Sequence, residues 1–152
     1  MSASREAIEK LVYLYAERID RGDFAGVGEL FADAEIRVAG SDAVTSGRDA
    51  VRELYETTTR RYADGTPKTK HLTTNLIIDI DEAAGRATCR SYFTVLQQTP
   101  DLPLQVVITG RYRDRFVRTD KEWQFAAREM ALDQFGDLSQ HLLVDAEALT
   151  RD

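Results

Sequence analysis

The chain has 152 residues, of which 43% are hydrophobic and 30% are charged, and its formal net charge is −6 at pH 7. A chain of this length is expected to form one domain over residues 1–152 with a single core. The acidic charge disfavours nucleic acid as a partner, and the lack of a signal pattern or an apolar run of about 18 residues predicts a cytoplasmic protein without membrane association.

The cysteine and histidine content limits the cofactors to be expected. The single cysteine, Cys89, excludes an intrachain disulfide and a cysteine-rich zinc site. Its neighbours alternate between apolar and polar residues, which predicts a buried structural thiol. The sequence has two histidines, no H-E-x-x-H motif and no glycine-rich phosphate loop, so we expect neither a metal ion nor a nucleotide cofactor.

The N-terminal part of the chain has the periodicity of helices. Apolar residues recur every three or four positions over residues 4–20, with Ser4 as the expected N-cap and Gly22 ending the helix. Asp23 is placed to cap a second, shorter helix that follows directly.

A third helix is expected after a short strand at residues 36–38. Ser46 followed by Asp49 resembles a capping box, so we expect Ser46 to open this helix, which ends before Gly65.

From Lys68 onward the apolar period changes from helical spacing to two. Four segments rich in β-branched and aromatic residues follow, near 69–80, 86–98, 104–117 and 122–133. Their connections have hairpin length, which predicts antiparallel neighbours in a meander, followed by a C-terminal helix over residues 138–149. Helices before a long antiparallel sheet indicate an α+β fold, in which a curled sheet covered by helices leaves a cavity for a small ligand.

Asp20 and His71 are the leading candidates for a catalytic pair. Asp20 ends the first helix, where the helix dipole disfavours an acid, so another reason for its position is expected. His71 lies early in the sheet region among Thr and Asn residues. If the fold joins them, the carboxylate holds one imidazole nitrogen while the other accepts a proton. The alternatives are a solvated helix-end acid and a strand histidine that bonds to nearby Thr or Asn.

Three tyrosines are further candidates. Tyr15 lies five residues before Asp20, and its hydroxyl could polarise a substrate carbonyl, although a helix-face tyrosine often belongs to the core with a solvated tip. Tyr55 and Tyr92 are candidate substrate-binding residues, because the third helix and the second long strand can direct them into the cavity or away from it.

The remaining candidates are polar residues of the sheet and of the C-terminal segment. Asn75 lies four residues beyond His71 and shares its face on an unbulged strand, where it could orient substrate. Arg128 either lines the cavity or pairs with Asp133 on the same strand. His141 is expected at the surface or in C-terminal packing.

Several segments resemble the SnoaL-like branch of the nuclear transport factor 2-like superfamily, in both order and spacing. They are residues 15–24, 30–34, 46–50, 71–75 and 110–112, with Trp123 at the start of the last strand. The resemblance implies a cystatin-like α+β roll, in which a cone-shaped antiparallel sheet is wrapped by three N-terminal helices and followed by a short C-terminal helix.

The resemblance also implies a catalytic pair. In dehydratase and dehydrochlorinase relatives, an Asp that ends the first helix pairs with a His that serves as the base, and Asp20 and His71 match these positions. Scytalone dehydratase also uses a second pocket histidine, which lies on a central strand. This chain differs, because its second histidine, His141, lies in the C-terminal segment.

Two functional hypotheses follow. The first is a cofactor-independent lyase or isomerase of dehydratase, dehydrohalogenase or cyclase type, which removes a proton from a small hydrophobic, cyclic substrate. The second is a non-catalytic ligand-binding or assembly subunit that resembles the small subunit of a ring-hydroxylating dioxygenase. An open cavity at His71 favours the first, and a cone filled by Phe side chains favours the second. Both are compatible with a homodimer or homotrimer formed through the outer face of the sheet.

Overall fold

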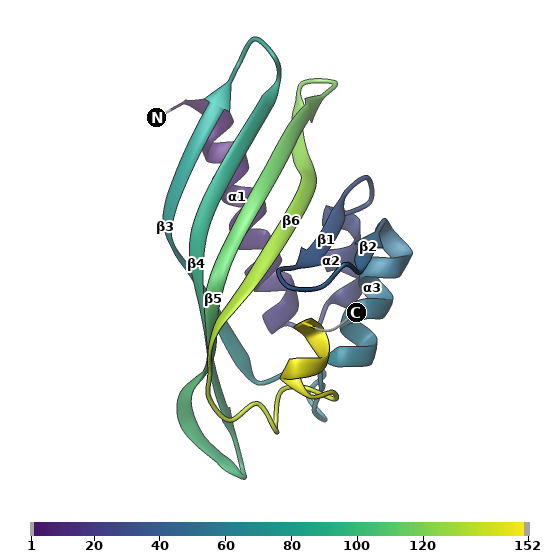
Figure 1. Ribbon diagram of the computed structural model, residues 1–152, viewed down its shortest axis with the longest axis vertical. Coiled ribbons are helices and arrows are strands. Elements are labelled where there is room, and N and C mark those ends of the chain that lie inside the picture. The colour runs from purple at the N-terminus through teal and green to yellow at the C-terminus, as the bar shows by residue number, and fades with distance from the viewer. Residues whose placement is uncertain (1, 151–152) are drawn as a thin grey trace.

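The structure is a computed structural model that describes residues 2–150. Three helices come first with two short strands, and four long strands and one 3-10 turn follow (Figure 1). In chain order the elements are α1 (Ala3–Asp20), α2 (Phe24–Leu30), β1 (Glu35–Val38), β2 (Val44–Ser46), α3 (Arg48–Thr58), β3 (Thr69–Asp81), β4 (Arg86–Thr99), β5 (Leu102–Thr119), β6 (Glu122–Phe135) and the 3-10 turn η1 (Ala146–Thr150).

The strands form one six-stranded sheet in the order β2-β1-β6-β5-β4-β3. The four long strands pair antiparallel with their sequence neighbours, which confirms the predicted meander. Among the described strands only β1 and β6 pair in parallel, and β2, α3 and the strands β3 to β5 lie between them in the chain. The sheet is curved, and α1 runs along one face with α2 and α3 beside it, so the predicted α+β fold is confirmed (Figure 1).

Two helices begin at other residues than predicted. Ser2 rather than Ser4 caps α1, because its hydroxyl accepts the Arg5 N–H at 3.1 Å. Asp23 caps α2 as expected, through the Gly26 N–H at 2.9 Å. Ser46 does not open α3, because it pairs with β1 as the last residue of β2, and Gly47 with a φ of 89° precedes the helix instead.

The predicted C-terminal helix is present only as a short 3-10 turn, and its predicted bounds of 138–149 are wrong. In the described part of the chain that follows β6, helical structure is assigned to Ala146–Thr150 alone. The preceding segment makes one short turn, in which the His141 and Leu142 N–H groups bond to the Leu138 carbonyl, and it then bonds to the body of the protein, from the Leu143 N–H to the Thr58 carbonyl at 2.9 Å. This tertiary hydrogen bond takes the place of the next i to i−4 bond that a longer helix requires.

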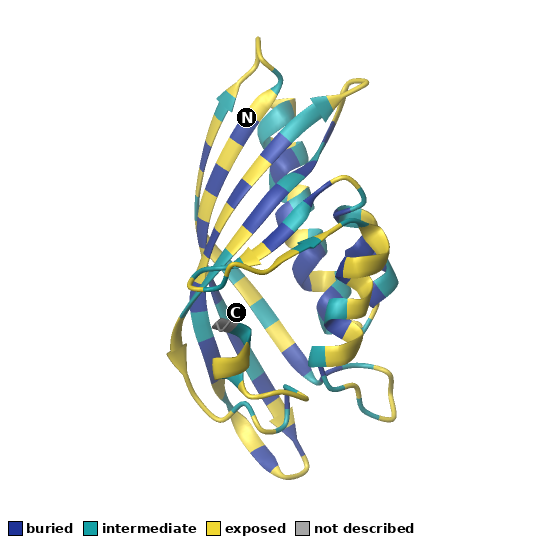
Figure 2. Cartoon of the chain, turned by 45° about the vertical axis from the view of Figure 1, so that its right-hand side comes forward, coloured by how far each residue is buried: buried dark blue, intermediate teal, exposed yellow. Residues whose placement is uncertain are grey.

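Aromatic rings fill much of the space between α1 and the sheet. Phe31 stacks on Phe125 at 4.7 Å between ring centroids, and Phe93 stacks on Tyr112 at 4.5 Å. Gly110 allows the second stack, because a Cβ atom there would lie 2.5 Å from the Phe93 ring. Buried and exposed residues alternate along the long strands, as a sheet with one covered face requires (Figure 2).

One ion pair is enclosed in this core. Arg128 on β6 and Asp114 on β5 have fully buried side chains and form two hydrogen bonds, at 2.8 and 2.9 Å. The guanidinium carbon also lies 3.6 Å from the ring centroid of Tyr112 and 4.2 Å from that of Tyr15. Burial raises the pKa of Asp114 more than its pairing with Arg128 lowers it. Because neither side chain is exposed to solvent, the pair depends on mutual neutralisation of the two charges.

Replacing Arg128 alone is expected to be strongly destabilising. Arg128→Met leaves Asp114 buried without its partner, which costs about 3–5 kcal/mol in the free energy of unfolding. The double variant Arg128→Met/Asp114→Leu removes both charges and should recover most of this loss. Urea unfolding measures both variants, and a single variant within about 1 kcal/mol of wild type would contradict this account of the core.

The outer face of the sheet carries exposed apolar side chains. They are 46–54% exposed and lie on β3, β4 and β5: Leu72, Ile77, Tyr92 and Val106. Charged residues surround them, including Arg111, which bonds to Asp133 at 2.9 Å. An apolar area with a charged rim is typical of a protein interface.

The protein is therefore predicted to self-associate through this face as a dimer or a trimer. Light scattering at micromolar concentration should give two or three times the chain mass of 17.1 kDa. The double variant Tyr92→Glu/Val106→Lys places charges in the contact and should shift the distribution toward the monomer. A wild-type protein that is entirely monomeric would disprove the interface.

Candidate active site

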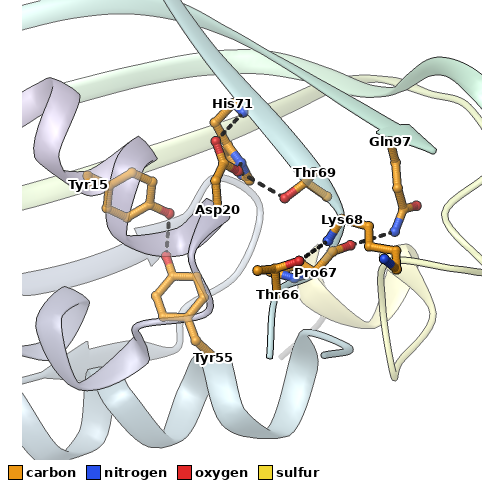
Figure 3. Close-up of polar contacts among 9 residues, drawn as sticks. All are labelled: Tyr15, Asp20, Tyr55, Thr66, Pro67, Lys68, Thr69, His71 and Gln97. Carbon is orange, nitrogen blue, oxygen red and sulfur yellow. Dashed lines mark hydrogen bonds and ion pairs between the residues drawn. The ribbon is translucent and has the colours of Figure 1, made fainter. Parts of the chain in front are cut away.

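The structure brings the side chains of Asp20 and His71 into direct contact. Asp20 is the last residue of α1 and His71 is the third residue of β3. His71 Nδ1 lies 2.7 Å from Asp20 Oδ1 (Figure 3). The same carboxylate accepts the His71 backbone N–H at 2.8 Å and the Thr69 hydroxyl at 2.9 Å. Only 8% of the His71 side chain and 13% of the Asp20 side chain are exposed.

These contacts keep Asp20 ionised and orient the ring of His71. Burial raises the pKa of Asp20, but the hydrogen bonds and charge of His71, together with the Thr69 hydroxyl, more than offset it, so the pKa lies below its usual 3.8. An ionised carboxylate favours the tautomer whose proton is on Nδ1. The Nε2 atom then carries the free lone pair, and no described residue hydrogen bonds to it. The geometry is that of an imidazole prepared to accept a proton.

Two tyrosine hydroxyls lie near this pair. Tyr15, from the same helix as Asp20, and Tyr55 of α3 share a hydrogen bond of 2.5 Å between their hydroxyl oxygens (Figure 3). Burial raises the pKa of both phenols, so both remain protonated at neutral pH. One hydroxyl of the pair donates to the other and leaves the second proton for another acceptor.

Of the other predicted substrate-binding residues, Tyr92 and Asn75 point away from this group, whereas Arg128 lies against the ring of Tyr15. Tyr92 is 54% exposed on the outer face, because its neighbours on β4 point inward. Asn75 has a φ of 58° and lies at a bulge of β3. The bulge adds one residue to the strand, so the Asn75 side chain points to solvent instead of sharing the face of His71. Arg128 pairs with Asp114 rather than with Asp133, which pairs with Arg111.

Of the two expectations for His141, the surface position is wrong and C-terminal packing is correct. It is 6% exposed, and its ring centroid lies 6.2 Å from that of His71. A signal was present, since Leu138, His141 and Leu142 have helical spacing, and a short turn there directs them inward through bonds from the His141 and Leu142 N–H groups to the Leu138 carbonyl.

Neither a metal-binding cluster nor a membrane-spanning helix is found among the described residues. Within residues 2–150, no group of three or more His, Cys, Asp and Glu side chains is arranged to hold a metal ion. None of the helices in that range is both long and apolar enough to cross a membrane.

Comparison with known proteins identifies the family. Residues 1–129 match the family model of the SnoaL-like domain, so the chain belongs to this family. No curated protein matches the sequence.

Solved structures agree with this assignment. An NTF2-like protein with a cystatin-like fold from Novosphingobium aromaticivorans is 25% identical, with a TM-score of 0.71 over 95% of this chain and 87% of that one. A candidate scytalone dehydratase from the same organism is 27% identical, with a TM-score of 0.69 over 88% and 87% of the two chains. LinA, at 21% identity and a TM-score of 0.70 over 90% of each chain, shares the fold.

Burial of His141 predicts a dependence of stability on pH. Burial and the nearby His71 charge lower the pKa of His141 to about 3 in the folded chain, against 6.5 for the free side chain, while Asp20 opposes the shift. Between these two values only the unfolded chain binds the proton, so stability falls with falling pH by about 1.4 kcal/mol per unit. Asp20 contributes stability above about pH 3.8, and this contribution is lost as the pH falls through its lowered pKa, so Asp20 adds little to the slope between about pH 6.5 and 4.

Urea unfolding of wild type and His141→Leu at pH 7, 6, 5 and 4 checks this prediction. The variant should lose less stability than wild type between about pH 6 and 4. Equal slopes in the two proteins would mean that His141 is not buried as described.

Proposed function

We propose that this SnoaL-like protein is a cofactor-independent lyase or isomerase in which His71 is the general base and Asp20 its partner. The observation that carries the proposal is the 2.7 Å contact between Asp20 Oδ1 and His71 Nδ1, with Nε2 free of protein partners among the described residues. A histidine held in this way has one nitrogen for orientation and the other for chemistry.

The proposed reaction begins with proton transfer from a substrate carbon to His71 Nε2. The electron pair of the broken C–H bond moves toward an adjacent carbonyl or expels a β leaving group. The Asp20 carboxylate stabilises the imidazolium that forms, and the hydroxyl pair of Tyr15 and Tyr55 donates to the oxygen that gains charge. His71 then returns the proton to another carbon, to the leaving group or to solvent, which completes an isomerisation, a cyclisation or an elimination.

The proposed substrate is a small, hydrophobic and cyclic molecule. Aromatic rings lie near the pair, since Tyr15 contacts the rings of Phe31, Tyr55 and Tyr112. Such surroundings favour a flat apolar ligand with few polar groups. The 27% identity to a candidate scytalone dehydratase supports a reaction of dehydratase type.

Deuterium exchange tests the reaction without knowledge of the substrate. A panel of cyclic ketones is incubated with the protein in D₂O, and NMR follows exchange of the protons next to the carbonyl. Wild type should accelerate exchange of at least one ketone, and His71→Ala should lose about 10²–10⁴-fold of that rate. If wild type and His71→Ala have equal rates across the panel, the proposal is wrong.

Asp20→Asn separates catalysis from structure. An amide cannot accept all three hydrogen bonds of Asp20, so either the His71 backbone bond is lost or the ring is forced to place its proton on Nε2. By analogy with hydrolase triads, the rate should fall by about 10⁴.

Thr69→Val is the matched control, because it removes one bond to Asp20 and leaves the ring bond intact; its rate should stay within about tenfold of wild type. Circular dichroism verifies that each variant is folded. An Asp20→Asn loss below about tenfold would assign Asp20 a structural role only.

An alternative function is an assembly or ligand-binding subunit without turnover. The apolar outer face at Leu72, Ile77, Tyr92 and Val106 and the aromatic filling of the interior favour it. The exchange measurement distinguishes the two functions, since an assembly subunit shows no His71-dependent rate.

A further inference from the structure

The segment from Gly136 to Asp145, here called the C-terminal strap, lies beyond the part of the chain that matches the family, which ends at residue 129. Its backbone bonds to the exit of α3, from the Arg60 N–H to the His141 carbonyl at 2.8 Å and from the Leu143 N–H to the Thr58 carbonyl at 2.9 Å. A bridge between Thr59 and Leu142 lies between these two bonds.

Gln140 bonds the strap to β4 and to Tyr62. Its backbone carbonyl accepts the Gln97 side-chain amide of β4 at 3.0 Å and the hydroxyl of Tyr62. The Gln97 amide also bonds to the Pro67 carbonyl at 3.0 Å, close to the start of β3 (Figure 3). The strap is therefore held by α3, by β4 and by the loop that leads to His71.

The strap places the His141 ring beside the Asp20–His71 pair. The two imidazole rings meet edge to face, with an interplanar angle of 67° and 6.2 Å between centroids. His141 is 6% exposed, and its Nδ1 atom is buried with no hydrogen-bond partner among the described residues. A buried polar nitrogen without a partner costs about 1–3 kcal/mol, so this atom has a reason to be there other than stability.

We propose that His141 lines the candidate active site and that its Nδ1 atom hydrogen bonds to an oxygen substituent of the ring-shaped ligand held against His71. This inference rests on the function proposed above and deepens it, because it assigns a second polar group to the substrate. Burial keeps His141 neutral at physiological pH, and a neutral imidazole has one donor and one acceptor nitrogen. It can therefore bind a hydroxyl or a carbonyl oxygen without adding a second positive charge beside His71.

The competing explanation is that His141 only fills space beneath the strap. Three substitutions separate the two. His141→Leu keeps an apolar side chain of similar size and removes both nitrogens. His141→Asn keeps a polar atom close to the position of Nδ1, and His141→Gln keeps one close to the position of Nε2. Ser139→Ala is the matched control, since Ser139 is exposed and its hydroxyl bonds only to Asp137 at 2.6 Å.

The test uses resorcinol and phenol, two neutral aromatic rings that differ by one hydroxyl. The chain has two histidines, so protein labelled with ¹⁵N-histidine shows two ring spectra, which His71→Ala assigns. Resorcinol should shift both rings along one saturation curve. His141→Leu should weaken resorcinol binding about tenfold, the equivalent of one hydrogen bond, and phenol binding by less than about threefold. His141→Asn should restore resorcinol binding to within about threefold of wild type, and His141→Gln should not.

The outcomes are distinct. Shifts confined to His71, or equal loss of the two ligands in His141→Leu, would overturn the role of His141 while leaving the exchange reaction of His71 intact. Equal behaviour of the Asn and Leu variants would overturn the assignment to Nδ1. If neither ring responds to either compound at 10 mM, the assignment of an oxygenated aromatic ligand is wrong, and the ketone exchange rates then decide separately whether His71 is a base. The Ser139→Ala protein should match wild type throughout.

Discussion

A single carboxylate joins the first helix to the sheet and organises the candidate site. Asp20 ends α1, where the helix dipole disfavours a negative charge, yet it accepts bonds from the Thr69 hydroxyl and from the backbone and ring of His71. These bonds compensate for the unfavourable position and fix where β3 begins relative to α1. The orientation of His71 therefore follows from the same contact that holds the two elements together.

The surroundings of this contact separate the proton affinities of neighbouring groups. Burial keeps protons on the hydroxyls of Tyr15 and Tyr55 and keeps them off His141, whereas hydrogen bonding keeps Asp20 ionised. Donors and acceptors are thus present together near His71 at neutral pH, an arrangement that acid–base chemistry requires. The buried Arg128 guanidinium adds rigidity, because it lies against the ring of Tyr15.

Much of the fold was predictable because its elements are encoded locally. Each long strand has a period of two and a hairpin-length connection, so antiparallel pairing was the only short path for the chain. The Asp20–His71 contact was predicted from two features together: an acid at a helix end where the dipole disfavours it, and a resemblance to a known family. Helix starts were less predictable. Ser2 rather than Ser4 caps α1, because its hydroxyl bonds to the first turn of the helix. Gly47 rather than Ser46 precedes α3, because Ser46 pairs with β1.

The sequence by itself determined the class of fold and the order of its elements, because periodicity and capping act between residues that are near in the chain. Asp20 and His71 were predicted as a candidate pair only with the help of a family resemblance, and the tertiary structure brings these two residues, which are far apart in the chain, into contact. Tertiary structure alone decided the partner of Arg128, the outward turn of Asn75 and the burial of His141. Asp114 and Arg128 meet through strand register, and a one-residue bulge reverses the face of Asn75. His141 is buried because its segment bonds to α3 and β4, and the local turn that begins at Leu138 does not by itself encode these bonds.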